Sequence, residues 1–201
     1  MFYCRKNEMS KLNKRYNENN FECIVIYGRR RVGKTALINE FCKDKPTIFF
    51  SALNSTAKEN LETLSRAIYE YKSSGADSIN APIYPDFDSA FAEITRLCEN
   101  ERLIFVIDEY PYLAKSDNSV SSRLQHIIDH IWSNSKLFLI LCGSSMSFME
   151  YQVLGYESPL FIHRYLWKIR LCCTVLQAVF RTISTSWVLQ IILTMPCLQL
   201  L

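Results

Sequence analysis

The chain has 201 residues, of which 49% are hydrophobic and 21% are charged, and its formal net charge at pH 7 is +3. This length suits one domain that buries about 70% of its unfolded surface, and the composition excludes an intrinsically disordered or collagen-like protein. The eight cysteines form no Cys-x-x-Cys pair, which excludes zinc-ribbon and thioredoxin spacing. Residues 1–17 contain no apolar run typical of a secretory signal, so we expect a cytoplasmic protein with reduced cysteines.

Apolar runs alternate with segments of helical periodicity along most of the chain. The apolar runs, which predict strands, cover residues 21–27, 47–52, 103–107 and 137–142. The helical segments cover residues 5–20 and 34–42, a stretch opened by the capping-box pair Thr56 and Glu59, residues 88–99, and a stretch marked by Leu124, Ile127, Ile128 and Ile131. Composition predicts loops at 73–86 and 111–119. Because the strands are apolar throughout, we predict an α/β fold in which a parallel sheet has helices on both faces.

The strongest motif is GRRRVGKT at residues 28–35, which matches the pattern G-x-x-x-x-G-K-[ST] between a predicted strand and a predicted helix. Its glycines let backbone amides turn inward around a phosphate chain, and the helix presents its N-terminal dipole to the phosphate oxygens. Lys34 supplies positive charge to the β- and γ-phosphates, and the Thr35 hydroxyl can ligate Mg²⁺. The predicted nucleotide-binding residues are Gly28, Arg29, Arg30, Arg31, Val32, Gly33, Lys34 and Thr35.

A second motif follows the apolar run at 103–107, where Asp108 and Glu109 stand side by side. An acidic residue at the end of a buried strand can hold Mg²⁺ opposite a phosphate-binding loop, and an adjacent glutamate can orient the attacking water as general base. The alternative is a strand end that simply meets solvent. Kinases of small molecules must prevent attack by water, so the pair favours a hydrolytic NTPase with Asp108 as metal ligand and with Lys34 and Glu109 as catalytic residues.

The strand predicted at 137–142 ends in Gly143, Ser144 and Ser145. A hydroxyl at the end of a neighbouring strand can contact the γ-phosphate or the attacking water, so Ser144 is the third candidate catalytic residue. The alternative is a turn of small residues that follows a strand.

Three further features have a structural interpretation that we favour. Arg29, Arg30 and Arg31 could form a nucleic-acid patch, but within a phosphate-binding loop we expect them to face solvent or the nucleotide. His126 and His130 have the spacing of metal ligands on a helix, but no third ligand follows them at a recognisable spacing, so we expect a solvated face. The segment 110–112 (Tyr-Pro-Tyr) is interpreted as loop packing against the sheet rather than as the lining of a substrate path.

The chain resembles the archaeal-type ATPases of the AAA+/STAND branch of P-loop NTPases. The resemblance covers about residues 1–160 and rests on YGRRRVGKTALINEF (27–41), FVIDEYPYL (105–113), LILCGSSMSFME (139–150) and VLGYESPL (153–160). It implies ATP and Mg²⁺ as ligands and a parallel sheet in the order 5-1-4-3-2. It assigns Lys34 and Thr35 to the phosphates and Mg²⁺, Asp108 to Mg²⁺, Glu109 to water activation, and residues 143–145 to the sensor position.

The sequence departs from this family in two places. Cys4 and Lys6 stand where the family has Gly and Glu, and after residue 160 the family's fifth strand, helical lid and C-terminal domains are not recognisable. Residues 158–201 contain four basic residues and no acidic one, whereas residues 1–157 carry a net charge of −1. We therefore divide the chain into a core at 1–160 and an atypical apolar tail at 161–201, for which we suggest a shifted reading frame in a truncated gene. A membrane-spanning tail is disfavoured by the polar residues within 182–201.

The sequence thus predicts an ATP-binding P-loop NTPase that hydrolyses ATP with Mg²⁺ and is the ATPase core of a larger AAA+/STAND-type protein. Two alternatives remain: a nucleotide-binding switch or binding module with negligible turnover, and the remnant of a DNA-transacting ATPase that lacks its effector domain. A homo-oligomer or a protein partner is left open. The core's net charge of −1 does not support nucleic-acid binding, and nothing in the sequence favours a membrane.

Overall fold

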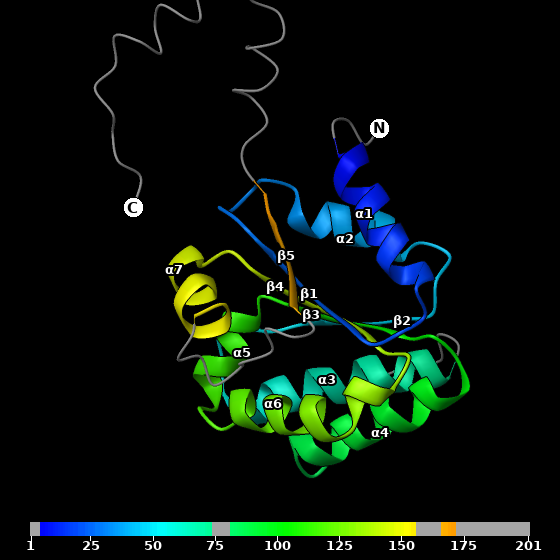
Figure 1. Cartoon of the computed structure of the whole chain (residues 1–201). Coiled ribbons are helices and arrows are strands. Elements are labelled where there is room, and N and C mark those ends of the chain that lie inside the picture. The colour runs from blue at the N-terminus through cyan, green and yellow to red at the C-terminus, as the bar shows by residue number, and fades with distance from the viewer. Residues whose placement is uncertain (1–4, 74–80, 156–165, 172–201) are drawn as a thin grey trace, which may run out of the picture. The chain divides into compact units, whose positions relative to one another are not determined.

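The computed structural model describes residues 5–73, 81–155 and 166–171 (Figure 1). The strands of the described residues form one parallel sheet in the order β2-β3-β4-β1-β5. These strands are β1 (Glu22–Tyr27), β2 (Thr47–Ser51), β3 (Ile104–Asp108), β4 (Phe138–Gly143) and β5 (Leu166–Arg170). Counted from its other edge the order is 5-1-4-3-2, so the predicted α/β fold and strand order are confirmed.

The helices follow the predicted segments closely, and two of them begin where side chains cap the backbone. Thr56 Oγ1 accepts a hydrogen bond from Glu59 N at 3.3 Å, as the capping-box spacing predicts, and Asp86 Oδ1 accepts one from Ser89 N at 2.7 Å. The helices are α1 (Lys6–Asn17), α2 (Lys34–Cys42), α3 (Ala57–Lys72), α4 (Phe87–Asn100), α5 (Tyr110–Ser116), α6 (Val120–His130) and α7 (Met146–Phe148), with a short 3-10 turn at Trp132–Asn134 and a π turn at Met149–Val153. None of the described helices is both long and apolar enough to cross a bilayer.

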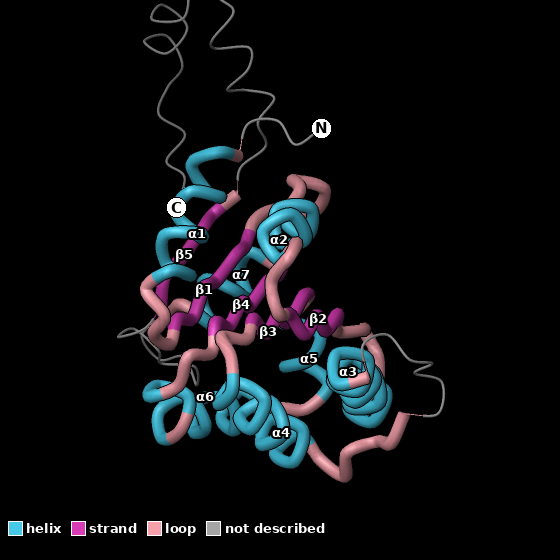
Figure 2. Tube along the Cα trace, turned by 90° about the vertical axis from the view of Figure 1, so that its right-hand side faces the viewer, coloured by secondary structure: helices cyan, strands magenta, loops and turns pink. Residues whose placement is uncertain are grey.

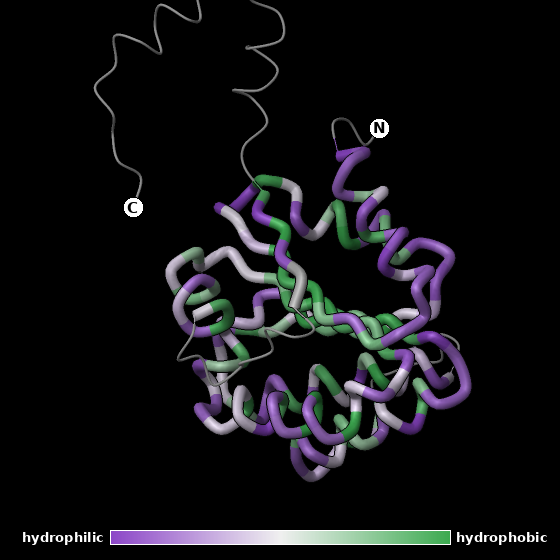
Figure 3. Tube along the Cα trace, viewed as in Figure 1, coloured by the Kyte–Doolittle hydropathy of each residue, from purple (hydrophilic) through white to green (hydrophobic). Residues whose placement is uncertain are grey.

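The sheet separates two hydrophobic cores, and α1 and α2 cover one face while α3, α4 and α6 cover the other (Figures 1 and 2). Successive residues of a strand point to opposite faces, so Cys23 and Val25 join one core and Ile24 and Ile26 join the other. Every residue of β1, β3 and β4 is buried, which explains why these strands are continuous apolar runs rather than alternating ones (Figure 3).

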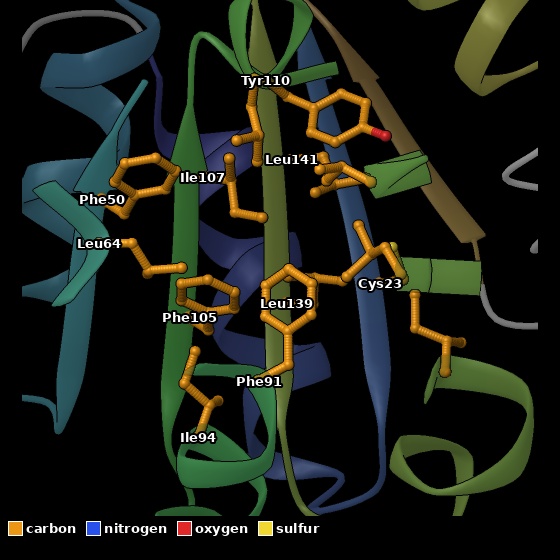
Figure 4. Packing of buried hydrophobic residues seen from close by; sticks show 14 of the residues in the cluster. Cys23, Phe50, Leu64, Phe91, Ile94, Phe105, Ile107, Tyr110, Leu139 and Leu141 are labelled. Carbon is orange, nitrogen blue, oxygen red and sulfur yellow. The ribbon is translucent and has the colours of Figure 1, made fainter. Parts of the chain in front are cut away.

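The larger core lies between the sheet and helices α3, α4 and α6, and its centre is aromatic. Phe91 of α4 packs edge-on against Phe105 of β3 and Trp132, with ring centroids 6.5 and 5.8 Å apart (Figure 4). The Trp132 indole N–H donates to Thr95 Oγ1 at 2.8 Å, so this buried ring also satisfies its only polar atom. The sheet is therefore a rigid support for the loops at its ends.

The strand β5 lies within the segment whose sequence departs from the family pattern. It pairs with β1 from Cys23 and Leu166 to Tyr27 and Arg170, and Leu171 N donates to Tyr27 O at 2.7 Å. Ile169 and Leu171 are buried in the core that α1 and α2 cover. The sheet and the compact unit thus continue past residue 160, to Leu171. The other residues of the predicted tail, 161–165 and 172–201, lie outside the described residues.

The prediction of a loop over residues 111–119 is wrong, because Tyr110–Ser116 form α5. Proline is tolerated in the first turn of a helix, where its missing N–H has no partner to lose, so Pro111 is compatible with this helix as its second residue. Tyr110, Leu113 and Ala114 are buried at helical spacing. This helix directly follows Glu109 and packs into the larger core beside the carboxyl end of β3.

Candidate functional site

The loop from Gly28 to Gly33 connects β1 to α2 and has a backbone that requires glycine at two places. Gly28 has φ +152°, and a Cβ atom there would stand 2.3 Å from the carbonyl oxygen of Leu171. Gly33 has φ +82° and caps α2 in the left-handed conformation. Close approach of β5 to the start of the loop therefore explains the first glycine of the motif, and the turn into the helix explains the second.

Lys34 lies in the first turn of α2 and is 6% exposed. Its Nζ donates to the carbonyl oxygens of Gly28 and Arg29, at 3.0 and 3.1 Å. The buried ammonium is thus held inside the loop by neutral dipoles, and no carboxylate pairs with it among the described residues. A phosphate oxygen would give this charge a stronger partner than a carbonyl does.

Thr35 and Asp108 meet although 73 positions separate them in sequence. Thr35 Oγ1 donates to Asp108 Oδ2 at 3.0 Å, and Asp108 Oδ1 accepts from Glu109 N at 3.0 Å. The carboxylate is 6% exposed and lies beside Cys142 of β4. Burial, followed by the charge of Asp108, raises the pKa of the Cys142 thiol, so that group stays neutral. The hydroxyl and the carboxylate together form a hard oxygen donor set, which is the chemistry that Mg²⁺ prefers.

Glu109 has φ +52°, a left-handed conformation that non-glycine residues rarely adopt. Its Oε2 accepts two hydrogen bonds from Ser144, one from Oγ at 3.0 Å and one from the backbone N at 3.3 Å. The unusual backbone and the two donors fix the carboxylate at the ends of β3 and β4. The structure thus brings the second and third predicted catalytic residues into contact.

A pocket of about 400 Å³ opens at this edge of the sheet. Its lining combines the phosphate-binding loop, the first turn of α2 and the glutamate, and consists of Arg30, Arg31, Gly33, Lys34, Thr35, Ala36 and Glu109. Five of these are predicted nucleotide-binding residues and Glu109 is a predicted catalytic one. The arrangement places the buried Lys34 ammonium, the Thr35 hydroxyl and the fixed Glu109 carboxylate on one cavity, with Asp108 bonded to Thr35.

Two arginine contacts at the site were not predicted from the sequence. Arg5, which precedes α1, donates through Nη2 to the Val32 carbonyl of the loop at 3.0 Å and pairs with Glu8 at 2.9 Å. Arg30 donates through Nη2 to the hydroxyl of Tyr112 on α5 at 2.7 Å. Both contacts join positions far apart in the chain, and a single sequence without coupled variation offers no signal that would find them.

Of the three features for which we favoured a structural interpretation, Arg30 and Arg31 line the pocket and Tyr112 contacts Arg30, whereas the two histidines and Tyr110 do not line it. His126 and His130 are exposed on α6 with ring centroids 4.5 Å apart, and the described residues contain no group of three metal-ligating side chains. Tyr110 is fully buried, and its hydroxyl is 2.7 Å from Ser121 Oγ. Burial raises the pKa of Tyr110, so it remains a neutral phenol.

The parallel sheet with a glycine-rich loop after β1 and an acidic pair after β3 defines a P-loop ATPase core. The model of the family described as the ATPase domain predominantly from Archaea matches residues 2–180, and the chain belongs to this family. The chain is therefore an ATP-binding ATPase core, and the predicted family resemblance is confirmed. The match extends beyond residue 160, where the resemblance was expected to end.

Two curated relatives come from the archaeon Methanocaldococcus jannaschii. The chain is 37% identical over 161 residues to the uncharacterized protein MJECL04, in an alignment that covers 80% of this chain and 34% of that protein. It is 51% identical over 45 residues to the uncharacterized ATP-binding protein MJ0423, covering 22% of this chain and 76% of that protein. The chain thus spans about a third of the length of MJECL04.

Among solved structures, the chain is similar to the Walker-type ATPase PABY2304 of Pyrococcus abyssi, with a TM-score of 0.63 and 22% identity over 85% of this chain and 53% of that one. It is also similar to the ORC2 protein of Aeropyrum pernix in its ADP form, with a TM-score of 0.60 and 18% identity over 85% of this chain and 48% of that one. At these identities the similarity shows the fold alone.

Proposed function

We propose that the chain hydrolyses ATP with Mg²⁺ and serves as the ATPase core of a larger AAA+/STAND-type protein. The observation that carries this proposal is the convergence of Lys34, Thr35 and Glu109 on one pocket, where Asp108 accepts a hydrogen bond from Thr35 and Ser144 donates one to Glu109. The coverage of only 34% of MJECL04 supports a larger protein, because about two thirds of that relative lies outside the aligned region.

In this proposal the loop amides and Lys34 bind the phosphate chain. Lys34 exchanges its two carbonyl partners for phosphate oxygens, and the dipole of α2 favours the same anion. Thr35 and Asp108 would hold Mg²⁺, and this ion, when bound, would neutralise part of the negative charge on the phosphates. A single carboxylate with one hydroxyl suits this ion, which usually completes its shell with phosphates and waters.

Glu109 acts in the same proposal as the residue that orients the attacking water. Ser144 occupies one carboxylate oxygen with two hydrogen bonds, so the other oxygen can accept from a water without the side chain swinging away. A base held in this way is positioned before the substrate arrives, which lowers the entropic part of the barrier. Lys34, Glu109 and Ser144 are thus the proposed catalytic residues.

Phosphate release by the full chain tests the proposal. We expect Mg²⁺-dependent release by the wild type, loss of ATP binding in Lys34→Ala, and retained binding with a rate reduced about 100-fold in Glu109→Gln, the size of a general-base contribution. Arg66→Ala, which removes an exposed arginine of α3 outside the pocket, is the control. Equal background rates of phosphate release in the wild type and in both site variants would contradict the proposal that this chain hydrolyses ATP.

A second candidate is a nucleotide switch with negligible turnover. The observation that favours it is the hydrogen bond from Ser144 to Glu109, because a carboxylate that keeps this bond after ATP binds would not activate water. It predicts ATP binding without phosphate release. A DNA-transacting remnant is a weaker candidate, since residues 1–157 carry a net charge of −1. The ORC1 protein of Aeropyrum pernix, whose structure is in complex with DNA, resembles the chain at 15% identity and a TM-score of 0.59.

We further propose a cytoplasmic location. Cys23, Cys98 and Cys142 are free and buried, and Cys42 is free and partly buried. Burial raises the pKa of Cys42 to about 11, so this thiol remains protonated and unreactive at neutral pH. Free thiols in the core suit a reducing compartment.

A further inference from the structure

Arg30, which lines the pocket, contacts Tyr112, which is not among the lining residues. Arg30 lies in the middle of the phosphate-binding loop and lines the pocket, whereas Tyr112 lies on α5, three residues after Glu109. Arg30 Nη2 donates to the Tyr112 hydroxyl at 2.7 Å across 82 positions of sequence. The Tyr112 ring is partly buried against the larger core, whereas the Arg30 side chain is exposed. The packed tyrosine therefore restrains the orientation of the arginine.

The charge of Arg30 has no carboxylate partner within the described part of the chain. Other arginines there pair with acids, as Arg15 does with Glu22 and Arg96 with Glu93. A phenol hydroxyl orients a guanidinium but does not neutralise it, and the remaining N–H donors of Arg30 stay available for an anion. A cation held in one orientation beside an anion-binding loop is prepared to bind an anionic ligand.

The position of the pair selects which phosphate it can reach. The loop amides cradle the inner phosphates of a bound nucleotide, whereas Glu109, the proposed water-orienting residue, marks the end where water would attack. The hydrogen bond between Arg30 and Tyr112 joins the loop to the helix that directly follows Glu109. Arg30 and Glu109 line the same pocket, so we assign Arg30 to the terminal phosphate rather than to an inner one.

We propose that Arg30, positioned by Tyr112, recognises the terminal phosphate and makes the site prefer nucleoside triphosphates over diphosphates. The inference rests on the proposed function, since it concerns the same nucleotide pocket. The guanidinium fork donates to the phosphate oxygens, and the tyrosine limits the rotamers that the arginine loses on binding. Arg30 is a specificity-determining residue and Tyr112 a positioning residue.

Calorimetric titration of the full chain with ADP and with a β,γ-imido analogue of ATP tests this inference, in the presence of Mg²⁺. Arg30→Ala should weaken binding of the triphosphate analogue about 10- to 100-fold, the loss expected for one charge-assisted hydrogen bond, and binding of ADP by less than about threefold. Arg30→Lys should recover part of the difference. Tyr112→Phe keeps the packed ring and should lower the triphosphate preference by about three- to fivefold. Arg66→Ala is the matched control for loss of one positive charge.

The outcomes separate this inference from the proposed function. Equal weakening of both nucleotides by Arg30→Ala, or no weakening of either, contradicts the inference while ATP binding stands. Loss of preference in Arg30→Ala with wild-type behaviour in Tyr112→Phe contradicts the positioning role of the tyrosine. If the wild type binds neither nucleotide, both the inference and the proposed function are wrong. Thermal unfolding of each variant shows whether it is folded. If Arg30→Ala does not fold, Tyr112→Phe tests the inference in its place.

Discussion

The two ends of the sheet each carry an arginine that joins distant segments, and the two arginines differ in how their charge is satisfied. Arg102 precedes β3 and donates to the carbonyl oxygens of Asn20, Lys136 and Arg15, at 2.9, 3.3 and 3.2 Å. Its guanidinium also lies over the rings of Tyr16 and Phe138, 5.0 and 5.6 Å from their centroids. Arg30, at the opposite end, has one neutral hydroxyl as its partner among the residues that the structure describes.

The backbone shows the same contrast. The turns that precede β1 and β2 use Asn19 and Asp44 at φ +56° and +62°, and these residue types tolerate the left-handed region. At the carboxyl end Arg31 and Glu109 occupy the same region at +64° and +52°, where their side chains make it costly. The amino end is thus built for stability, and the carboxyl end accepts strain to aim side chains into a pocket.

Removal of Arg102 should give the largest change in stability. Arg102→Ala leaves three carbonyls without a charged donor and two rings without a cation, so we expect the free energy of unfolding to fall by about 2–4 kcal/mol. Urea denaturation measures this loss. Arg102→Lys, which keeps the charge but not the fork, should recover less than half of it.

Affinity for the triphosphate analogue should distinguish the two ends of the sheet. Among folded Arg102→Ala molecules the affinity for the triphosphate analogue should match that of the wild type, whereas Arg30→Ala changes affinity and leaves stability nearly unchanged. A loss of nucleotide affinity in Arg102→Ala at temperatures where it is folded would show that the two ends are coupled.

Ser144→Ala should reduce the rate of phosphate release about tenfold with little change in KM. The variant removes the hydroxyl that donates to Glu109 at 3.0 Å and leaves the weaker backbone donor at 3.3 Å. Steady-state kinetics separate kcat from KM, and a tenfold loss corresponds to about 1.4 kcal/mol of transition-state stabilisation. Ser147→Ala, an exposed serine of α7, is the matched control. A higher rate in Ser144→Ala would mean that this serine restrains the glutamate.

The sequence predicted most of the scaffold because burial on both faces of a parallel sheet leaves a clear signal. The runs at 103–107 and 137–142 fall within one residue of β3 and β4, and the capping box at Thr56 begins α3. The helix α5 was missed because Pro111 and a short polar stretch resemble a loop locally. Only packing against the core, which buries Tyr110 and Leu113, makes this segment helical.

The site was predictable to the extent that its chemistry lies in contiguous motifs. The sequence predicts residues 28–35 and the pair Asp108–Glu109 as site residues because phosphate binding requires those residue types at fixed spacing, and the structure brings Thr35 and Asp108 into contact. The contacts of Arg5 with Val32 and of Arg30 with Tyr112 depend instead on which loops the tertiary fold brings together. The backbone conformation of Glu109 was likewise invisible, because nothing in its residue type favours positive φ.

A comparison of two substitutions at Glu109 tests the strain at the carboxyl end. Both Glu109→Gly and Glu109→Ala remove the carboxylate and its contacts with Ser144, but only glycine adopts φ near +52° without a steric penalty. We expect the glycine variant to be more stable by about 1 kcal/mol, the reverse of the order in a right-handed helix. Urea denaturation of the two variants measures the difference. Greater stability of the alanine variant would refute strain at this residue.

Glu93 of α4 lies away from the predicted site residues and provides the smallest test. Its carboxylate pairs with Arg96 at 2.6 Å and with Lys72 at 2.8 Å, and the hydrogen bond from Arg96 is the main cause that lowers its pKa from 4.5 to about 2. Because the pKa is lower in the folded state, the stabilisation is present above about pH 4.5 and is lost as the pH falls toward 2.

Since the partners of Glu93 are largely exposed, solvent screening limits this contribution to about 0.5 kcal/mol. The difference in unfolding free energy between the wild type and Glu93→Gln should therefore be constant from pH 7 to 5 and shrink between pH 4.5 and 2. Denaturation curves across this range, repeated at high salt, measure it. If the difference in unfolding free energy instead grows on acidification, the ion pairs of Glu93 do not stabilise the fold. The acid sensitivity would then arise at the carboxyl ends of the strands, where Arg31 and Glu109 are strained, rather than in the helices.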